Sequence, residues 1–203
     1  METKIAKTIS YLFHPLLIPM YGALLIFYIY SNSFFVVPPM FIVFICSIIF
    51  VSTCLMPAIS SLFLLRSNYI KSLMLSESEE RKPPMILTSA FYLLNYYLLS
   101  KMPIHSGLKV FLLGTCVGVV IALIVNMFWK ISTHAIGIGG ILGVLLGLSF
   151  RMHYNLSVLI IVAVLLFGFI GFARLKLNAH SPGQIYVGFA VGIISEAALY
   201  FIF

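Results

Sequence analysis

Charged residues are scarce in this sequence. They make up 8% of its 203 residues, while hydrophobic residues make up 62%. A soluble domain carries about 25% charged residues, because its surface must be hydrated. A soluble domain is therefore excluded, and lipid must be the solvent for most side chains. We predict one integral membrane domain over residues 1–203.

Cysteines are also few, and their spacing excludes some chemistry. Cys46, Cys54 and Cys116 all lie in apolar runs, and none belongs to a CxxC pair. Such isolated positions offer neither a redox pair nor a metal-binding pair. We expect buried free thiols, which behave as small apolar side chains. A small-residue cleavage site is also lacking after the first apolar run, so we expect a retained first span rather than a signal peptide.

Long apolar runs occupy most of the chain instead. A helix needs about 20 apolar residues to cross a bilayer, and several runs of that order are present. They predict an all-α bundle of six or seven transmembrane helices. Pro15 and Pro19 predict a bent or interfacial entry into the first span, and Pro57 predicts a kink in the second. The predicted spans are approximately 11–30, 40–65, 85–100, 110–129, 135–150, 156–172 and 185–203.

Glycines recur four residues apart in three of these spans. Small residues at that spacing share one helix face and let two backbones approach closely. The fourth, fifth and seventh spans are therefore expected to form the packed centre. The glycines concerned are Gly114, Gly118, Gly139, Gly143, Gly147, Gly188 and Gly192.

The basic residues are unevenly distributed over the predicted loops. With seven spans, the N-terminus and the loops after spans two, four and six share one membrane face. Of the twelve lysines and arginines, only Lys101, Lys109 and Arg151 fall on the other face. The net charge of +7 thus sits in short loops beside apolar spans. This placement favours anionic lipid or a phosphorylated ligand as partner, and not nucleic acid.

Three polar segments on the richer face carry cations, histidines or hydroxyls. They resemble, in order, the three signatures of the type 2 phosphatidic acid phosphatase superfamily. In segment 173–184, Arg174 and His180 keep the spacing of the third signature, and Gln184 stands where that signature has Asp. Segment 132–134, Ser-Thr-His, is similar to the second, and segment 79–83, Glu-Glu-Arg-Lys-Pro, to the first. The resemblance implies a superfamily-like core at 66–203, with two further spans at 1–65.

The resemblance also implies a chemistry. His180 would attack phosphorus to form a phosphohistidine, His134 would protonate the leaving oxygen, and Gln184 would orient His180. Imidazoles suit such opposite roles because they titrate near neutral pH. No metal or other cofactor is required in this scheme, and the sequence offers no carboxylate cluster to hold one. The predicted phosphate-binding residues are Arg81, Lys82, Ser132 and Arg174.

The expected function is a membrane phosphatase or phosphotransferase acting on a lipid phosphate or diphosphate, in a bacterial inner membrane. Two alternatives remain open. The neutral Gln184 also fits a catalytically weak or inactive protein that binds a phospholipid head group. Glu196 inside the last span, together with the proline-broken spans, fits a small transporter. The oligomeric state and the side of the membrane that carries the site are also left open.

Overall fold

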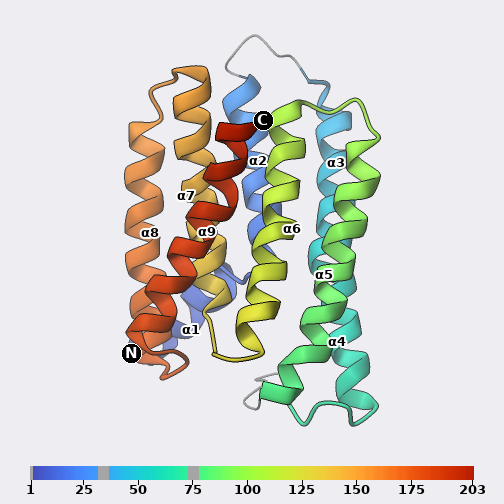
Figure 1. Ribbon diagram of the computed structural model, residues 1–203, viewed down its shortest axis with the longest axis vertical. Coiled ribbons are helices and arrows are strands. Elements are labelled where there is room, and N and C mark those ends of the chain that lie inside the picture. The colour runs from blue at the N-terminus through green and yellow to red at the C-terminus, as the bar shows by residue number, and fades with distance from the viewer. Residues whose placement is uncertain (1, 32–36, 73–77) are drawn as a thin grey trace.

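The computed structural model describes residues 2–31, 37–72 and 78–203, and these residues form helices without any strand (Figure 1). Connections at 32–36 and 73–77 lie outside the described residues, including part of the predicted polar loop before the third span. The helices are α1 (Glu2–Leu12), α2 (Ile18–Ser31), α3 (Pro39–Phe50), the π-helical η1 (Val51–Leu55), α4 (Met56–Arg66), α5 (Ser78–Ser100), α6 (Ser106–Asn126), α7 (Thr133–Met152), α8 (Ser157–Lys176) and α9 (Pro182–Ile202).

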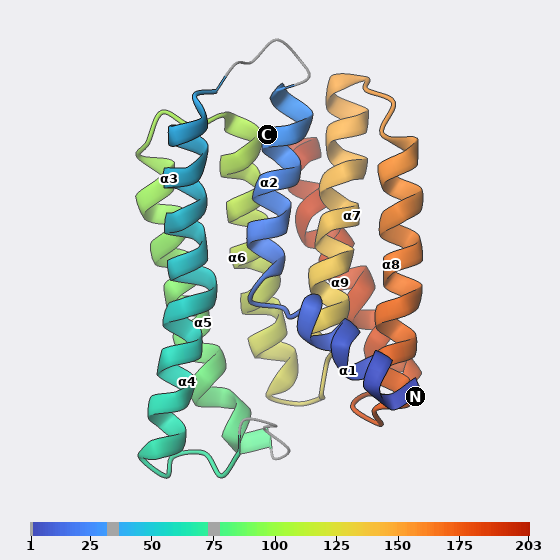
Figure 2. The same ribbon diagram turned by 180° about the vertical axis from the view of Figure 1, so that it is seen from behind.

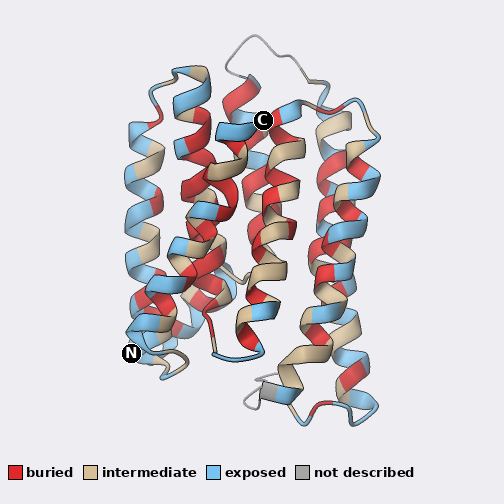
Figure 3. Cartoon of the chain, viewed as in Figure 1, coloured by how far each residue is buried: buried red, intermediate tan, exposed pale blue. Residues whose placement is uncertain are grey.

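Five helical segments in the described chain are long and apolar enough to cross a membrane. They indicate an integral membrane protein. The apolar α2 is shorter, and α5 does not belong to the five. Large apolar side chains such as Val158 and Phe169 stand exposed on α8, as expected where lipid is the solvent (Figure 3). The five segments are Pro39–Arg66, Ser106–Asn126, Thr133–Met152, Ser157–Lys176 and Pro182–Ile202.

The predicted first span is divided in two. Helix α1 ends at Leu12, and α2 begins at Ile18. Pro15 lies in the turn between them, where its ring and missing N–H oppose a continuous helix. The short α1 lies at one end of the bundle and packs against α8 (Figures 1 and 2). Lys176 also forms an ion pair with Glu2.

The predicted second span is one continuous helical segment of 28 residues, Pro39–Arg66. Pro57 has no N–H to donate to the carbonyl of Thr53. Directly before this proline the helix widens into the π-helical η1, and the N–H of Met56 donates to the carbonyl of Val51. The proline therefore changes the hydrogen-bond register without ending the span.

Helix α5 begins earlier than the sequence predicts. It starts at Ser78, so Arg81 and Lys82 lie in its first turns and not in a loop. Glu79 and Glu80 stand in the first turn. Their negative charge favours helix there, because the N-terminus of a helix carries partial positive charge.

Helices α7 and α9 cross in close contact at the centre of the bundle, as their glycines predict. A Cβ atom at Gly192 would collide with the carbonyl oxygen of Ile136 on α7. A Cβ atom at Gly139 would collide in the same way with the carbonyl oxygen of Phe189 on α9. The two backbones touch at these points, and α7 is the most buried of the five spans (Figure 3).

The connections that carry the polar segments lie at one end of the bundle. The N-terminus and the α6–α7 and α8–α9 connections lie there, together with the start of α5 (Figures 1 and 2). The α5–α6 and α7–α8 connections lie at the opposite end. Segments more than a hundred residues apart in the sequence are thereby brought to the same end of the molecule.

Candidate functional site

A cavity of about 950 Å³ opens among the helix ends at this face. Its lining comes from α1, the turn after it and the start of α2, from α4 to α9, and from the α6–α7 and α8–α9 connections. All three polar segments contribute to the lining, through Arg81, His134 and the pair Arg174 and His180. Lys130 adds a further cation.

The start of α7 is held against the start of α9. Ser132 caps α7, and its hydroxyl oxygen accepts from the N–H of Ala135 at 3.4 Å. The N–H of Ser132 donates to the carbonyl oxygen of Gln184 at 3.2 Å. In the α6–α7 turn, the N–H of Ile131 donates to Oδ1 of Asn126 at 3.4 Å. These bonds fix where His134, two residues after Ser132, enters the cavity.

Ser10 on α1 joins two of the predicted site residues. Nε2 of His134 lies 3.1 Å from the carbonyl oxygen of Ser10. A carbonyl oxygen only accepts, so Nε2 is the donor, and in the neutral ring the lone pair is on Nδ1. Nη1 of Arg174 donates to Oγ of Ser10 at 3.3 Å. The short α1 therefore positions both side chains.

Arg174 carries a donor that the described residues leave unused. Its Nε is buried and has no hydrogen-bond partner among them. A buried N–H without an acceptor is costly, and native structures normally supply one from protein, water or a ligand. Because the side chain lines the cavity, its guanidinium group is placed to meet an anion there.

Gln184 fixes the tautomer of His180. Nδ1 of His180 lies 3.2 Å from Oε1 of Gln184, and the N–H of Ser181 donates to the same oxygen at 3.1 Å. An amide oxygen only accepts, so Nδ1 carries the proton and Nε2 the lone pair. The Ser181 contact completes a capping box at the start of α9. The same hydrogen bonds that begin the helix therefore orient the imidazole.

Cations crowd the mouth of the cavity. Burial, followed by the positive charge of Arg174, lowers the pKa of His180 to about 4, so the ring is neutral near pH 7. Burial also lowers the pKa of Lys130, and Arg81 and Arg174 add to that effect. Among the described lining residues the only carboxyl is that of Glu196, which lies at the inner end. A bound anion would relieve this repulsion.

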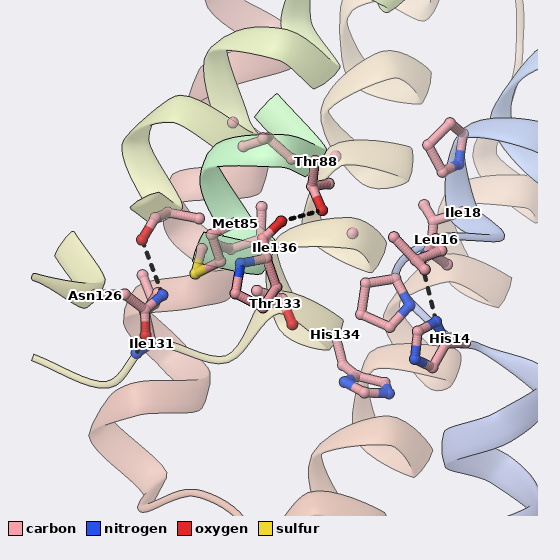
Figure 4. Close-up of a pocket in the computed structure, with 18 of the residues that line it drawn as sticks. His14, Leu16, Ile18, Met85, Thr88, Asn126, Ile131, Thr133, His134 and Ile136 are labelled. Carbon is pink, nitrogen blue, oxygen red and sulfur yellow. Dashed lines mark hydrogen bonds between the residues drawn. The ribbon is translucent and has the colours of Figure 1, made fainter. Parts of the chain in front are cut away.

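His14 adds a third histidine to the cavity. Its Nδ1 accepts from the N–H of Leu16 at 3.3 Å. Its ring lies edge to face with that of His134, with centroids 5.8 Å apart (Figure 4). Burial, and then Arg174, lowers its pKa. In the described chain, no group of three or more His, Cys, Asp or Glu side chains is arranged to hold a metal ion.

Three residues of the cavity, Ser10, His14 and Lys130, are not among the residues that the sequence predicts for the site. Lys130 stands two residues before Ser132, so its closeness along the chain was an available signal. No local pattern marks Ser10 and His14, because their partners are more than a hundred residues away along the chain.

The predicted site residues are not all in the cavity. Four of them line it: Arg81, His134, Arg174 and His180. Gln184 does not belong to the lining, but its Oε1 is hydrogen-bonded to His180. Ser132 acts as a helix cap and is fully buried. Lys82 does not belong to the lining, and its Nζ forms an ion pair of 2.6 Å with Glu79.

Comparisons of the chain with protein-family models, curated proteins and solved structures gave no match. The functional argument therefore depends on the geometry of this cavity and on the three polar segments that meet around it.

Proposed function

We propose that the protein is a membrane phosphatase or phosphotransferase that acts on a lipid phosphate or diphosphate through a phosphohistidine on His180. The observation that carries the proposal is the pairing of His180 with Gln184 beside Arg174. It provides a neutral imidazole with a fixed tautomer next to a buried, unsatisfied guanidinium N–H. These are the requirements for a nucleophile that faces a phosphoryl group.

Phosphate binding is supported by the charge around the mouth. Arg174, Arg81 and Lys130 line the cavity together. Phosphate oxygens accept several charge-assisted hydrogen bonds at once, and an arginine provides two donors in a fixed geometry. In this proposal Lys130 binds the phosphate in place of Lys82, because the Lys82 ammonium is paired with Glu79.

In the first chemical step, Nε2 of His180 donates its lone pair to phosphorus, and the bond from phosphorus to the leaving oxygen breaks. The ring becomes cationic, and Oε1 of Gln184 accepts from Nδ1–H throughout. His134 carries an added proton on Nδ1 and gives it to the leaving oxygen, while Nε2–H stays on the carbonyl of Ser10. This division of roles requires two imidazoles in opposite protonation states.

In the second step, His134 is neutral and accepts a proton from an attacking water or alcohol. The phosphorus–nitrogen bond breaks, and the electron pair returns to Nε2 of His180. Water as acceptor gives inorganic phosphate, and an alcohol gives phosphoryl transfer. Each histidine finishes in its initial protonation state, so the cycle balances without a metal.

A lipid substrate is supported by the shape of the cavity and the class of the protein. Cations line the mouth of the cavity, and apolar residues such as Met85, Phe111 and Ile136 also belong to its lining. The cations suit a phosphate head group, and the apolar lining suits a hydrocarbon chain. We also propose that α2 and α5 cross the membrane beside the five clear spans, giving seven, with a superfamily-like core at 66–203 in a bacterial inner membrane.

Phosphate release tests the proposal. The purified protein in lipid nanodiscs is given a phosphatidic acid and a polyprenyl diphosphate, and phosphate is measured. We expect turnover that falls by at least about 100-fold in His180→Ala, as for loss of a nucleophile. Vanadate, a mimic of the transition state, should bind less tightly to Arg174→Ala than to Lys109→Ala. Lys109 is the matched control, because its Nζ donates to Ser100 at the opposite end.

A binding protein is the second candidate, and Gln184 is the observation that favours it. A neutral amide orients His180 but supplies no negative charge to stabilise the cationic ring. In that case vanadate and lipid phosphates bind at Arg174, while no substrate is hydrolysed by the wild type. That result would contradict the enzyme and leave a protein that recognises phospholipid head groups.

A further inference from the structure

Glu196 is a buried carboxyl that the proposed chemistry does not use. It lies in α9, is 1% exposed, and lines the same cavity. Its Oε2 has no hydrogen-bond partner among the described residues. A carboxyl in the apolar middle of a membrane bundle is costly unless something satisfies it.

Three glycines of neighbouring helices make room for this side chain. A Cβ atom at Gly114 on α6 would collide with the carboxyl. On α7, a Cβ atom at Gly143 would lie 2.9 Å from Cβ of Glu196, and one at Gly140 would lie 3.5 Å from its Cγ. The carboxyl is therefore built into the helix contacts and held in one position at the inner end of the cavity.

Two hydroxyls line the cavity beside it. Oγ of Ser195 donates to the carbonyl of Gly192 at 3.0 Å, and Oγ1 of Thr115 donates to the carbonyl of Leu112 at 2.8 Å. Each hydroxyl has used its proton on its own helix, so only lone pairs remain. Thr115, Ser195 and Glu196, the inner polar group, together offer acceptors and one unpartnered carboxyl oxygen.

The carboxyl of Glu196 lies within one leaflet of a bilayer, below the mouth of the cavity. Its Oε1 and Cγ lie at the level of Gly140, which follows His134 at the mouth by six residues on α7, or about 9 Å at 1.5 Å per residue. Half of the hydrocarbon thickness is about 15 Å. An extended chain spans about 1.2 Å per bond, so about seven or eight bonds separate the two ends.

We propose that the inner polar group is a second binding site, in which Glu196 hydrogen-bonds a hydroxyl carried on the hydrocarbon chain of the phosphorylated lipid. The inference depends on the proposed function, because it places the phosphate of the same molecule at Arg174. A plain hydrocarbon would leave the carboxyl unsatisfied, whereas a hydroxyl both donates and accepts. The preferred substrate class is therefore an oxygenated chain with its polar group about 9 Å below the phosphate.

Two matched series of ligands test this assignment. Binding of alkyl phosphates with about six to about ten carbons is compared with that of the same phosphates bearing a terminal hydroxyl. For the wild-type protein we expect the hydroxyl to tighten binding about five- to tenfold at one chain length, the gain of a buried hydrogen bond. Equal or weaker binding at every length would overturn the proposal and leave water as the partner of Glu196.

Variants separate this proposal from the proposed function. Glu196→Leu should reverse the preference, so that the plain chain binds better, while the isosteric Glu196→Gln should keep part of it. An unchanged preference in Glu196→Leu would overturn the assignment. Arg174→Ala should weaken both series equally. If neither series binds the wild type, or if Arg174→Ala has no effect, the phosphate site itself fails, and the second site fails with it.

Discussion

Gln184 has two tasks at the scale of a single residue. Its Oε1 accepts from Ser181 to start α9 and from His180 to orient the ring. The first task needs an acceptor of this length at the third helix position, where Gln and Glu both serve. In the proposed reaction, the second task gains from a negative charge, because the attacking imidazole becomes cationic. Only a glutamate meets both needs.

We predict that Gln184→Glu raises the turnover of a lipid phosphate by about tenfold, equivalent to about 1.4 kcal/mol of transition-state stabilisation. Gln184→Asp carries the same charge and matches the superfamily signature, but it is one methylene shorter and should gain less. Steady-state phosphate release measures both variants. The gain should vanish in a His180→Ala background, and a gain that persists there would rule out His180 as nucleophile.

The pKa of His180 predicts how anion binding depends on pH. In the empty site this pKa is about 4, mainly through burial and then through Arg174. A bound dianion favours the protonated ring, so its pKa rises in the complex. Between the two pKa values, affinity for the anion increases as pH falls, by up to about tenfold per pH unit.

Sulfate is a suitable anion for measuring this pH dependence, because its own charge stays at −2 over the pH range of the experiment. Calorimetric titrations from about pH 8 to about pH 5 should show tighter sulfate binding and growing proton uptake as the pH falls. His180→Asn should flatten the dependence, leaving the smaller contributions of His14 and His134. A wild-type affinity that does not change with pH would place the anion away from His180.

At the scale of elements, the contact between α7 and α9 supports the site. Both helices begin at the cavity, and their glycines allow the two backbones to touch. The N–H of Ser132 and the carbonyl of Gln184 extend that contact to the first residues of the site. The relative position of His134 and His180 therefore depends on glycines buried further along the same helices.

We predict that Gly192→Ala destabilises the protein by about 1–3 kcal/mol, because an added methyl overpacks the contact with Ile136. Gly168→Ala is the matched control in α8, since no atom lies within 4 Å of a Cβ added there. That change should be neutral or stabilising, because alanine favours helix more than glycine does. Thermal unfolding in detergent measures both, and equal melting temperatures would refute the tight contact.

At the scale of the whole molecule, the site requires three connections on one membrane face. In a chain without its native cysteines, single cysteines near these connections should react with an impermeant maleimide from one side only. Cysteines at the other end should react only from the opposite side. The first set is Tyr69→Cys, Phe128→Cys and Ser181→Cys, and the second is Lys101→Cys and Asn155→Cys. Labelling of the first set from different sides would exclude a shared site.

Several features of this protein could be predicted from sequence because they are local. Scarce charge and long apolar runs determined the membrane class, and glycines four residues apart marked the central helices. His180, Ser181 and Gln184 lie within one turn at a helix start, so their spacing alone brought them together. Helix geometry repeats along the chain, and such patterns need no knowledge of the other elements.

Only the tertiary structure decided which residues share the cavity. Neighbours on a helix point about 100° apart, so the rotation of α5 determines that Arg81 lines the cavity while Lys82 pairs with Glu79. The helix break at Pro15 lets α1 pack against α8. This packing brings Ser10 next to His134, which is 124 residues away in the sequence. Glu196 meets the same cavity because glycines admit its carboxyl. These relations depend on how helices pack, which no single segment of the sequence specifies.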